Sequence, residues 1–213
     1  MRTDQLIELL TADLKPVDRG RISRALIMAL AIGATAAFSA MFLFLKPRHE
    51  MFDSRNLIFL LAKLLFTLGV VASAAMFLPR FARPGTDGRS ILPFVALPFV
   101  AIIALAAAAL ASSHWSTWGN MIVGKNWLTC FFSIPLFATV PFAAVVWALR
   151  IGAPTDRTRA GATAGLVAGG LSAAACALPC ADDSFPSIAL WYGLMIGICT
   201  SFGARLGPRL LRW

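Results

Sequence analysis

Six long apolar stretches constrain this 213-residue chain more than any other feature of its sequence. A helix rises about 1.5 Å per residue, so about 20 apolar residues cross the hydrocarbon core of a bilayer. The stretches cover residues 25–45, 57–78, 91–111, 128–149, 160–179 and 185–203. They leave no room for a separate soluble domain. The sequence therefore predicts an all-α, polytopic membrane bundle of six transmembrane helices, with residues 25–213 as the transmembrane domain.

The composition agrees with a chain embedded in lipid. Hydrophobic residues make up 59% of the sequence and charged residues 14%. A soluble domain of this size carries roughly 45–50% apolar and about 25% charged residues. The number and length of the apolar stretches exclude the alternative of one large soluble core.

The 19 lysines and arginines are distributed unevenly between the two sides of the predicted bundle. The side that holds both termini and the second and fourth loops carries Arg2, Lys15, Arg19, Arg21, Arg24, Arg80, Arg83, Arg89, Arg150, Arg157, Arg159, Arg205, Arg209 and Arg212. The opposite side carries Lys46, Arg48, Arg55 and Lys125. Cations concentrate in cytoplasmic loops, so we expect both termini in the cytoplasm. The net charge of +9 is then a sign of membrane topology, and no direct contact with nucleic acid is expected.

Polar and small residues inside the predicted spans indicate where Lys63 lies and how the helices pack. Lys63 lies within the second span, and its long stem is expected to snorkel outward to the membrane surface, with a buried functional role as the alternative. Glycines at four-residue spacing occur in the fifth and sixth spans: Gly161, Gly165, Gly169, Gly193 and Gly197. Small residues at this spacing let helix backbones approach closely in lipid. We expect packing within one chain, with a homodimer as the alternative.

A short amphipathic helix is predicted before the first span, over residues 3–14. Thr3 is positioned to cap it, and Pro16 ends it. Its apolar face consists of Leu6, Ile7, Leu9, Leu10 and Leu14. Helices that lie on a membrane surface usually have a Lys/Arg-rich polar face, whereas this polar face is largely acidic. The helix is therefore expected to bind a protein partner rather than the bilayer.

The chain has four cysteines, two of which are predicted at the outer surface. Cys130 opens the fourth span and Cys180 ends the fifth, so both face an oxidising compartment. The pair could form a disulfide, bind a thiophilic metal as soft thiolate ligands, or have only a structural role. Asp182, Asp183 and His114 are possible assisting ligands. Cys176 and Cys199 lie deeper and are expected to be small apolar fillers.

Several motifs along the chain resemble the NrsF family. They are Thr3-Asp4-Gln5-Leu6-Ile7, Pro16-Val17, the cysteine that opens the fourth span, Cys180-Ala181-Asp182-Asp183-Ser184, Trp191-Tyr192 and the ending Gly207-Pro208-Arg209-Leu210-Leu211-Arg212-Trp213. That family consists of six-span inner-membrane anti-sigma factors of Gram-negative bacteria, which hold an extracytoplasmic-function (ECF) sigma factor inactive. The resemblance implies that residues 1–24 form a cytoplasmic sigma-binding segment. It also implies that Cys130 and Cys180 sense a metal or oxidative stress.

Two other classes of membrane protein remain as alternatives. A thiol oxidoreductase coupled to quinone would use a closely spaced cysteine pair, and no CxxC motif is present. An ion-coupled transporter usually needs a carboxylate inside the membrane, and all ten acidic residues lie outside the predicted spans or at their margins. We therefore expect a regulator without enzymatic activity and without an obligatory cofactor, for which a thiophilic metal ion could be the signal.

Overall fold

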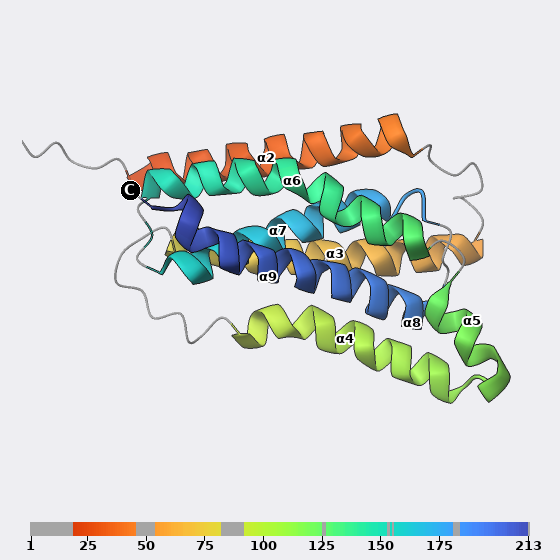
Figure 1. Ribbon diagram of the computed structural model, residues 1–213. Coiled ribbons are helices and arrows are strands. Elements are labelled where there is room, and N and C mark those ends of the chain that lie inside the picture. The colour runs from red at the N-terminus through yellow and green to blue at the C-terminus, as the bar shows by residue number, and fades with distance from the viewer. Residues whose placement is uncertain are drawn as a thin grey trace, which may run out of the picture.

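Long helices make up nearly all of the computed structural model, which describes residues 19–45, 54–81, 92–124, 127–152, 154, 156–180 and 184–212 (Figure 1). The helices are α2 (Arg19–Phe44), α3 (Ser54–Phe81), α4 (Leu92–Ala111), α6 (Trp127–Gly152) and α7 (Arg157–Cys176), followed by α8 (Phe185–Ser187), the π-helical η3 (Ile188–Tyr192) and α9 (Gly193–Leu210), which run on as one helix. A 3-10 turn, η2 (Trp115–Thr117), and the short α5 (Trp118–Val123) connect α4 to α6. The all-α prediction is confirmed, and each predicted stretch coincides closely with one long helix. The predicted helix over 3–14 lies outside the described residues.

The long helices run back and forth between two ends of the bundle (Figure 1). At one end α2, α4 and α7 begin and α3, α6 and α9 end, and we call it the arginine end. Its described arginines are Arg19, Arg21, Arg24, Arg80, Arg150, Arg157, Arg159, Arg205, Arg209 and Arg212. At the opposite end α7 stops at Cys176 and α6 starts at Trp127, and we call it the cysteine end. The unequal charge of the two ends agrees with the asymmetry seen in the sequence.

Helix α7 lies at the centre of the bundle. It packs against α9, α6, α3 and α2, and 16 of its 20 residues are buried. Its residues are mostly Ala and Gly, whose small side chains let four helices approach on different faces. At its start, the side chain of Asp156 accepts a hydrogen bond from the backbone N–H of Arg159 (3.0 Å), which caps the helix. Helix α7, which all the other long helices except α4 contact closely, is thus the helix with the smallest side chains.

Helix α7 has a lower hydropathy than the other long helices. Among the described residues, five helical stretches are long and apolar enough to cross a membrane, and α7 is not one of them. Arg159 falls within every window of 18 residues in this 20-residue helix, and the Gly, Ser and Thr residues contribute little hydrophobicity. Such residues are tolerated at the centre of a bundle, because neighbouring helices rather than lipid surround them.

The glycines of α7 bring its backbone into direct contact with α9. A Cβ atom added at Gly161 would overlap the carbonyl oxygen of Gly203, and one added at Gly165 would overlap that of Cys199. These contacts confirm the prediction that the glycines of the fifth span pack within the chain. Gly197 differs, because nothing lies within 4 Å of a Cβ added there.

Helix α4 lies at the edge of the bundle, apart from α7 (Figure 1). It contacts α3 and the α8–η3 segment. Two aromatic pairs join it to α3: Phe66 with Phe99 at 5.4 Å between ring centroids, and Phe77 with Phe94 at 5.9 Å. Other described helices therefore leave much of its surface uncovered.

The contact between α7 and α9 predicts unequal effects of the same substitution at two glycines. Gly165→Ala places a methyl group against the Cys199 carbonyl, and we expect it to lower stability by about 1–3 kcal/mol, as overpacking does. Gly197→Ala meets open space, so it should leave stability unchanged or raise it by up to about 1 kcal/mol through helix propensity. Thermal unfolding of both variants in the same detergent measures the difference. Equal melting temperatures would contradict the close packing.

Candidate functional site

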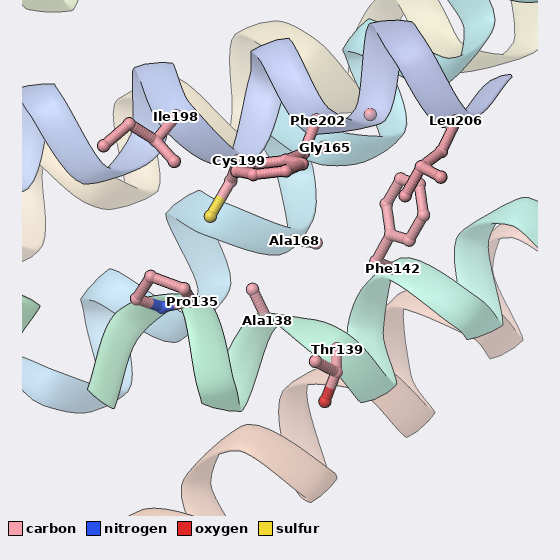
Figure 2. Close-up of a pocket in the computed structure, with 11 residues that line it drawn as sticks. Pro135, Ala138, Thr139, Phe142, Gly165, Ala168, Ile198, Cys199, Phe202 and Leu206 are labelled. Carbon is pink, nitrogen blue, oxygen red and sulfur yellow. The ribbon is translucent and has the colours of Figure 1, made fainter. Parts of the chain in front are cut away.

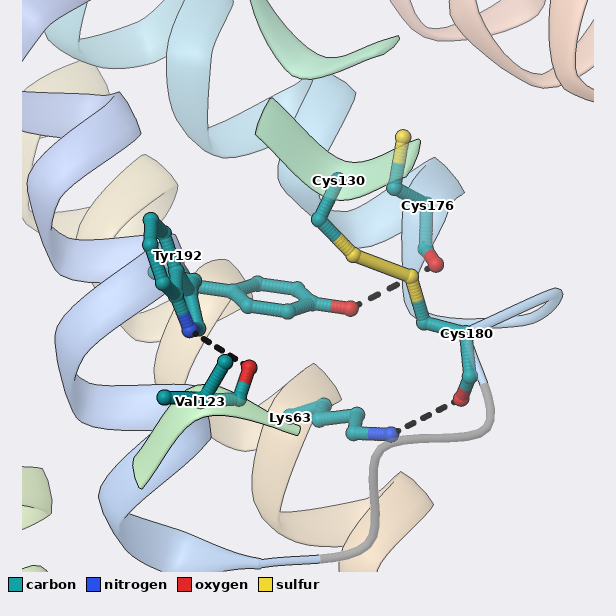
Figure 3. The surroundings of a disulfide bond; sticks show 7 residues. Lys63, Val123, Cys130, Cys176, Cys180 and Tyr192 are labelled. Atoms are coloured by element: carbon teal, nitrogen blue, oxygen red, sulfur yellow. Dashed lines mark hydrogen bonds between the residues drawn. A yellow bond between two sulfur atoms is a disulfide. The ribbon is translucent and has the colours of Figure 1, made fainter. Parts of the chain in front are cut away.

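A disulfide joins two helices at the cysteine end (Figure 3). It links Cys130, in the first turn of α6, to Cys180, which follows the C-terminal turn of α7. The two Cα atoms are 7.2 Å apart, although the residues are 50 positions apart in the sequence. The sequence left disulfide, metal-ligand and structural roles open for this pair, and the structure shows the disulfide. The bond ties the start of α6 to the end of the central helix.

Both cysteines of the disulfide are buried rather than exposed. Cys130 is 2% exposed and Cys180 is 7% exposed. The prediction that they lie at the outer surface is therefore wrong, because the packed ends of α6 and α7 cover them. They lie near the end of the bundle, but under a layer of protein. A reagent can reach the sulfur atoms only if this layer opens.

Lys63 of α3 lies at this site, although its side chain was expected at the membrane surface. Its side chain is 1% exposed, and its Nζ donates a hydrogen bond to the backbone carbonyl of Cys180 (3.0 Å, Figure 3). The prediction that it snorkels to the membrane surface is therefore wrong. A carbonyl beyond the end of α7 attracts a cation, since the C-terminal end of a helix carries partial negative charge. Lys63 thus connects α3 to the disulfide.

Tyr192 connects the last helix to the same place. It is buried at the end of η3, and its hydroxyl donates a hydrogen bond to the backbone carbonyl of Cys176 (3.4 Å, Figure 3). Single turns of π-helix inside α-helices frequently occur at functional sites. Here the π-helical stretch carries Tyr192 toward the end of α7. Residues from α3, α6 and η3 therefore meet around the last turn of α7.

The segment before α6 is held by the residues that precede Tyr192. The Nε1 of Trp191 donates to the carbonyl oxygens of Ile122 and Val123 (3.1 Å each), and the hydroxyl of Ser184 donates to that of Met121 (2.7 Å). The Trp191-Tyr192 motif thus contacts the two segments that the disulfide joins. Trp191 binds the residues before α6, and Tyr192 binds the end of α7.

The remaining candidate ligands are not assembled into a metal site in the part of the chain that the structure describes. His114 is exposed, and its Nδ1 lies 3.3 Å from the hydroxyl of Ser116. No three His, Cys, Asp or Glu residues among those described come together as a metal site. Asp182 and Asp183 lie outside the described residues. Their role and that of His114 as assisting ligands stay predictions.

The two other cysteines are free thiols inside the bundle. Cys176 and Cys199 are both buried, as predicted for apolar fillers. Cys199 lines an apolar cavity of about 190 Å³ between α6, α7 and α9, and its sulfur points into it (Figure 2). Neither forms a disulfide.

The structure does not test the predicted sigma-binding face. Leu6, Ile7, Leu9, Leu10 and Leu14 lie outside the described residues, so that assignment stays a prediction. The site at the cysteine end contains two residues to which the sequence analysis gave no role there, Lys63 and Tyr192. A lone cation within an apolar span was the available signal for Lys63, since such residues usually pair inside the protein.

The comparisons with known proteins agree over nearly the whole chain. Residues 10–213 match the family described as NrsF, negative regulator of sigma F. A probable anti-sigma-F factor NrsF from Azospira oryzae is 30% identical over 213 residues, covering 100% of both chains. An anti-sigma-F factor NrsF from Caulobacter vibrioides is 29% identical over 217 residues, also covering 100% of both. These relatives are named as regulators and not as enzymes. No solved structure is significantly similar to this chain.

The hydrogen bond from Lys63 predicts that this side chain stabilises the end of α7. Lys63→Met keeps an apolar stem of similar length but removes the donor to a buried carbonyl, which typically costs about 1–3 kcal/mol. We expect a lower melting temperature and faster reduction of the disulfide, measured by thiol labelling after addition of a membrane-permeant reductant. Thr67→Val is the control, because Thr67 bonds only carbonyls of its own helix. If Lys63→Met behaves like this control, Lys63 does not hold the site.

Proposed function

The chain belongs to the NrsF family, and from this premise we propose that it is a membrane-bound anti-sigma factor. It holds an ECF sigma factor inactive at the cytoplasmic face of a bacterial inner membrane and releases it when a metal or oxidative signal acts on Cys130 and Cys180. The observation that carries this proposal is the match of residues 10–213 to a family of negative regulators of sigma F. The full-length similarity to two proteins named as anti-sigma-F factors supports it.

In this proposal six helices span the membrane with both termini in the cytoplasm. Five helical stretches are apolar enough to do so by themselves. We count α7 as the sixth, because 20 residues at about 1.5 Å each reach about 30 Å, the thickness of the hydrocarbon core. The arginine end then faces the cytoplasm and the cysteine end the periplasm, as the preference of cations for the inner side requires.

The sigma factor is proposed to bind residues 1–24. Residues 1–18 of this segment precede α2 in the sequence, and residues 19–24 are the first residues of α2, at the arginine end. The support comes from the sequence: five apolar side chains on one face of a predicted helix, with an acidic opposite face. Such a helix fits an apolar groove on a protein partner, one of the common modes of peptide recognition.

The signal is proposed to act through the redox or metal-bound state of Cys130 and Cys180. Oxidation removes two electrons and two protons from two thiols and forms the disulfide, whereas a thiophilic metal would bridge the two thiolates of the reduced state. Each event changes how the start of α6 is held against the end of α7. A signal shifts such an equilibrium only by its differential affinity for the two states, and covalent or thiolate–metal bonds supply a large difference.

The path from the cysteine end to the arginine end runs through α7. This helix is buried along most of its length and contacts the backbone of α9, so its end cannot shift without moving α9. At the arginine end α9 is joined to α6 by a hydrogen bond from the Nε of Arg150 to the carbonyl of Leu210 (2.8 Å). Packed helices of this kind move as units by small shifts, which supports a change reaching the sigma-binding side.

The thiol oxidoreductase alternative finds no specific support in the described geometry. Its disulfide would have to exchange with a substrate, and catalytic cysteines are usually partly exposed and closely spaced. Here both cysteines are buried and come from separate helices. The relatives, in addition, are named as anti-sigma factors.

The proposed sigma-binding face predicts release of the sigma factor by two substitutions. Leu6→Asp together with Leu10→Asp should weaken sigma binding at least about a hundredfold, since burying each leucine contributes about 1.5–3 kcal/mol. Co-purification from detergent-solubilised membranes and expression of the sigma-dependent genes are the measurements. The double variant Thr11→Asp and Ala12→Asp adds the same charge on the other side and should still bind. If the leucine variant accumulates normally and still represses, the sigma factor is held elsewhere.

The proposed signal site predicts that the two cysteines act as a pair. Cys130→Ser and Cys180→Ser should each abolish the response or lock it in one state, because each leaves one thiol without its partner. The measurement is induction of the sigma-dependent genes by cadmium, chromate or an oxidant at matched protein level. Cys199→Ser, at a buried free thiol of α9, is the control and should respond normally. A normal response in both disulfide variants would leave the bond a purely structural role.

A further inference from the structure

A groove of about 780 Å³ runs between α3 and α4 on the outside of the bundle. Its lining includes Ala62, Gly69 and Met76 from α3 and Leu97, Ala101 and Leu105 from α4. Met76, Leu97 and Leu105 are exposed, so the groove opens sideways to the surroundings of the bundle. In a membrane, which the proposed function assumes, this opening faces lipid. None of the residues that line the groove belongs to the disulfide site.

Midway along the groove, the backbones of α3 and α4 approach each other closely. A Cβ atom added at Gly69 would lie 3.6 Å from the Cβ of Pro98, so the two backbones are close there. A volume of about 780 Å³ is too small for a membrane-spanning α-helix, which is about 10–12 Å wide and about 30 Å long, whereas acyl chains can occupy it. Gly69 is 11 residues from Arg80, or about 16 Å along the helix, roughly the thickness of one leaflet. The contact therefore lies near the middle of the membrane and marks the limit of the half of the groove at the arginine end.

The half of the groove at the arginine end has a cation at its mouth. The Cζ of Arg80 lies 5.1 Å from the centre of the Phe77 ring, which in turn pairs with Phe94 of α4. Arg80 and Ser73 supply the polar side chains among the lining residues. The hydroxyl of Ser73 donates to the carbonyl of Val70 within its own helix (2.9 Å). The groove is thus apolar along its length and positively charged at one end.

We propose that this half-groove binds one anionic phospholipid of the cytoplasmic leaflet. Its acyl chains lie between α3 and α4 from Phe94 to the contact at Gly69, and Arg80 binds the headgroup phosphate. The apolar space is one leaflet long and fits acyl chains, and the cation lies at the level of the headgroups, where it attracts an anionic lipid. This inference rests on the proposed membrane embedding, but not on sigma binding or on the cysteine pair.

The test counts lipids retained by the full-length protein. The protein is reconstituted into vesicles of equal parts phosphatidylglycerol and phosphatidylcholine, extracted in a mild neutral detergent and analysed by native mass spectrometry. The wild type should retain one phosphatidylglycerol in preference to phosphatidylcholine. Arg80→Gln should lower this occupancy about fivefold, the effect of about 1 kcal/mol for one cation near an anionic headgroup, and Arg80→Lys should preserve it. Arg205→Gln, which removes an exposed cation of α9 at the same end, is the control and should retain the lipid.

A second pair of variants separates the groove from the charge. Ser73→Phe fills the groove between Gly69 and Arg80 and should also lose the lipid, whereas Ala72→Phe, on an exposed position of the same helix outside the groove, should keep it. Equal melting temperatures in detergent show that both variants fold. Lipid loss in both, or in neither, would overturn the assignment to this groove.

The remaining outcomes are distinguishable from failure of the membrane proposal. If the wild type resists extraction by alkaline carbonate yet retains no phospholipid, or retains both lipids equally, the lipid site is wrong and membrane embedding stands. If carbonate removes the protein from vesicles, both proposals fail. If native mass spectrometry shows a second copy of the chain in place of the lipid, and Ser73→Phe abolishes it, the groove is a dimer interface and the lipid proposal is overturned.

Discussion

The close approach of α7 to α9 is the contact on which the rest of the structure depends. In lipid there is little hydrophobic gain from bringing helices together, so association relies on close packing of small side chains. Gly161 and Gly165 meet the backbone of α9 directly. Only a helix made of small residues can be surrounded in this way by α9, α6, α3 and α2. The low hydropathy of α7 and its central position therefore have the same cause.

This arrangement gives the end of α7 unusual importance at the cysteine end. Three neighbours hold it: Lys63 of α3 through the carbonyl of Cys180, Cys130 of α6 through the disulfide, and Tyr192 of η3 through the carbonyl of Cys176. Hydrogen bonds in such a buried place are stronger than in water, and an unpaired group costs more. A change at the disulfide therefore acts on the helix that most of the bundle contacts, which is why the proposed signal site and the fold share the same residues.

Sequence reasoning succeeded where the signal is local and failed where it depends on neighbours. Helix positions follow from the length of apolar runs, and the charge difference between the two ends follows from counting cations, so both agreed with the structure. The error on Lys63 had a physical reason. Snorkelling was expected from the length of its stem, but a carbonyl from a segment 117 residues away offered a nearer partner. The burial of Cys130 and Cys180 was missed in the same way, because the covering helices are distant in sequence.

The sequence by itself determined that this chain forms long apolar helices, that its cations gather on one side, and that two cysteines stand near the other side. Each of these properties depends on residue type and spacing along one segment. Only the tertiary structure decided that α7 is the buried centre, that the cysteines form a covered disulfide, and that α3 and α4 leave an apolar groove with Arg80 at its mouth. Those features arise where surfaces of separate helices meet, and no periodicity within a single helix specifies its neighbours.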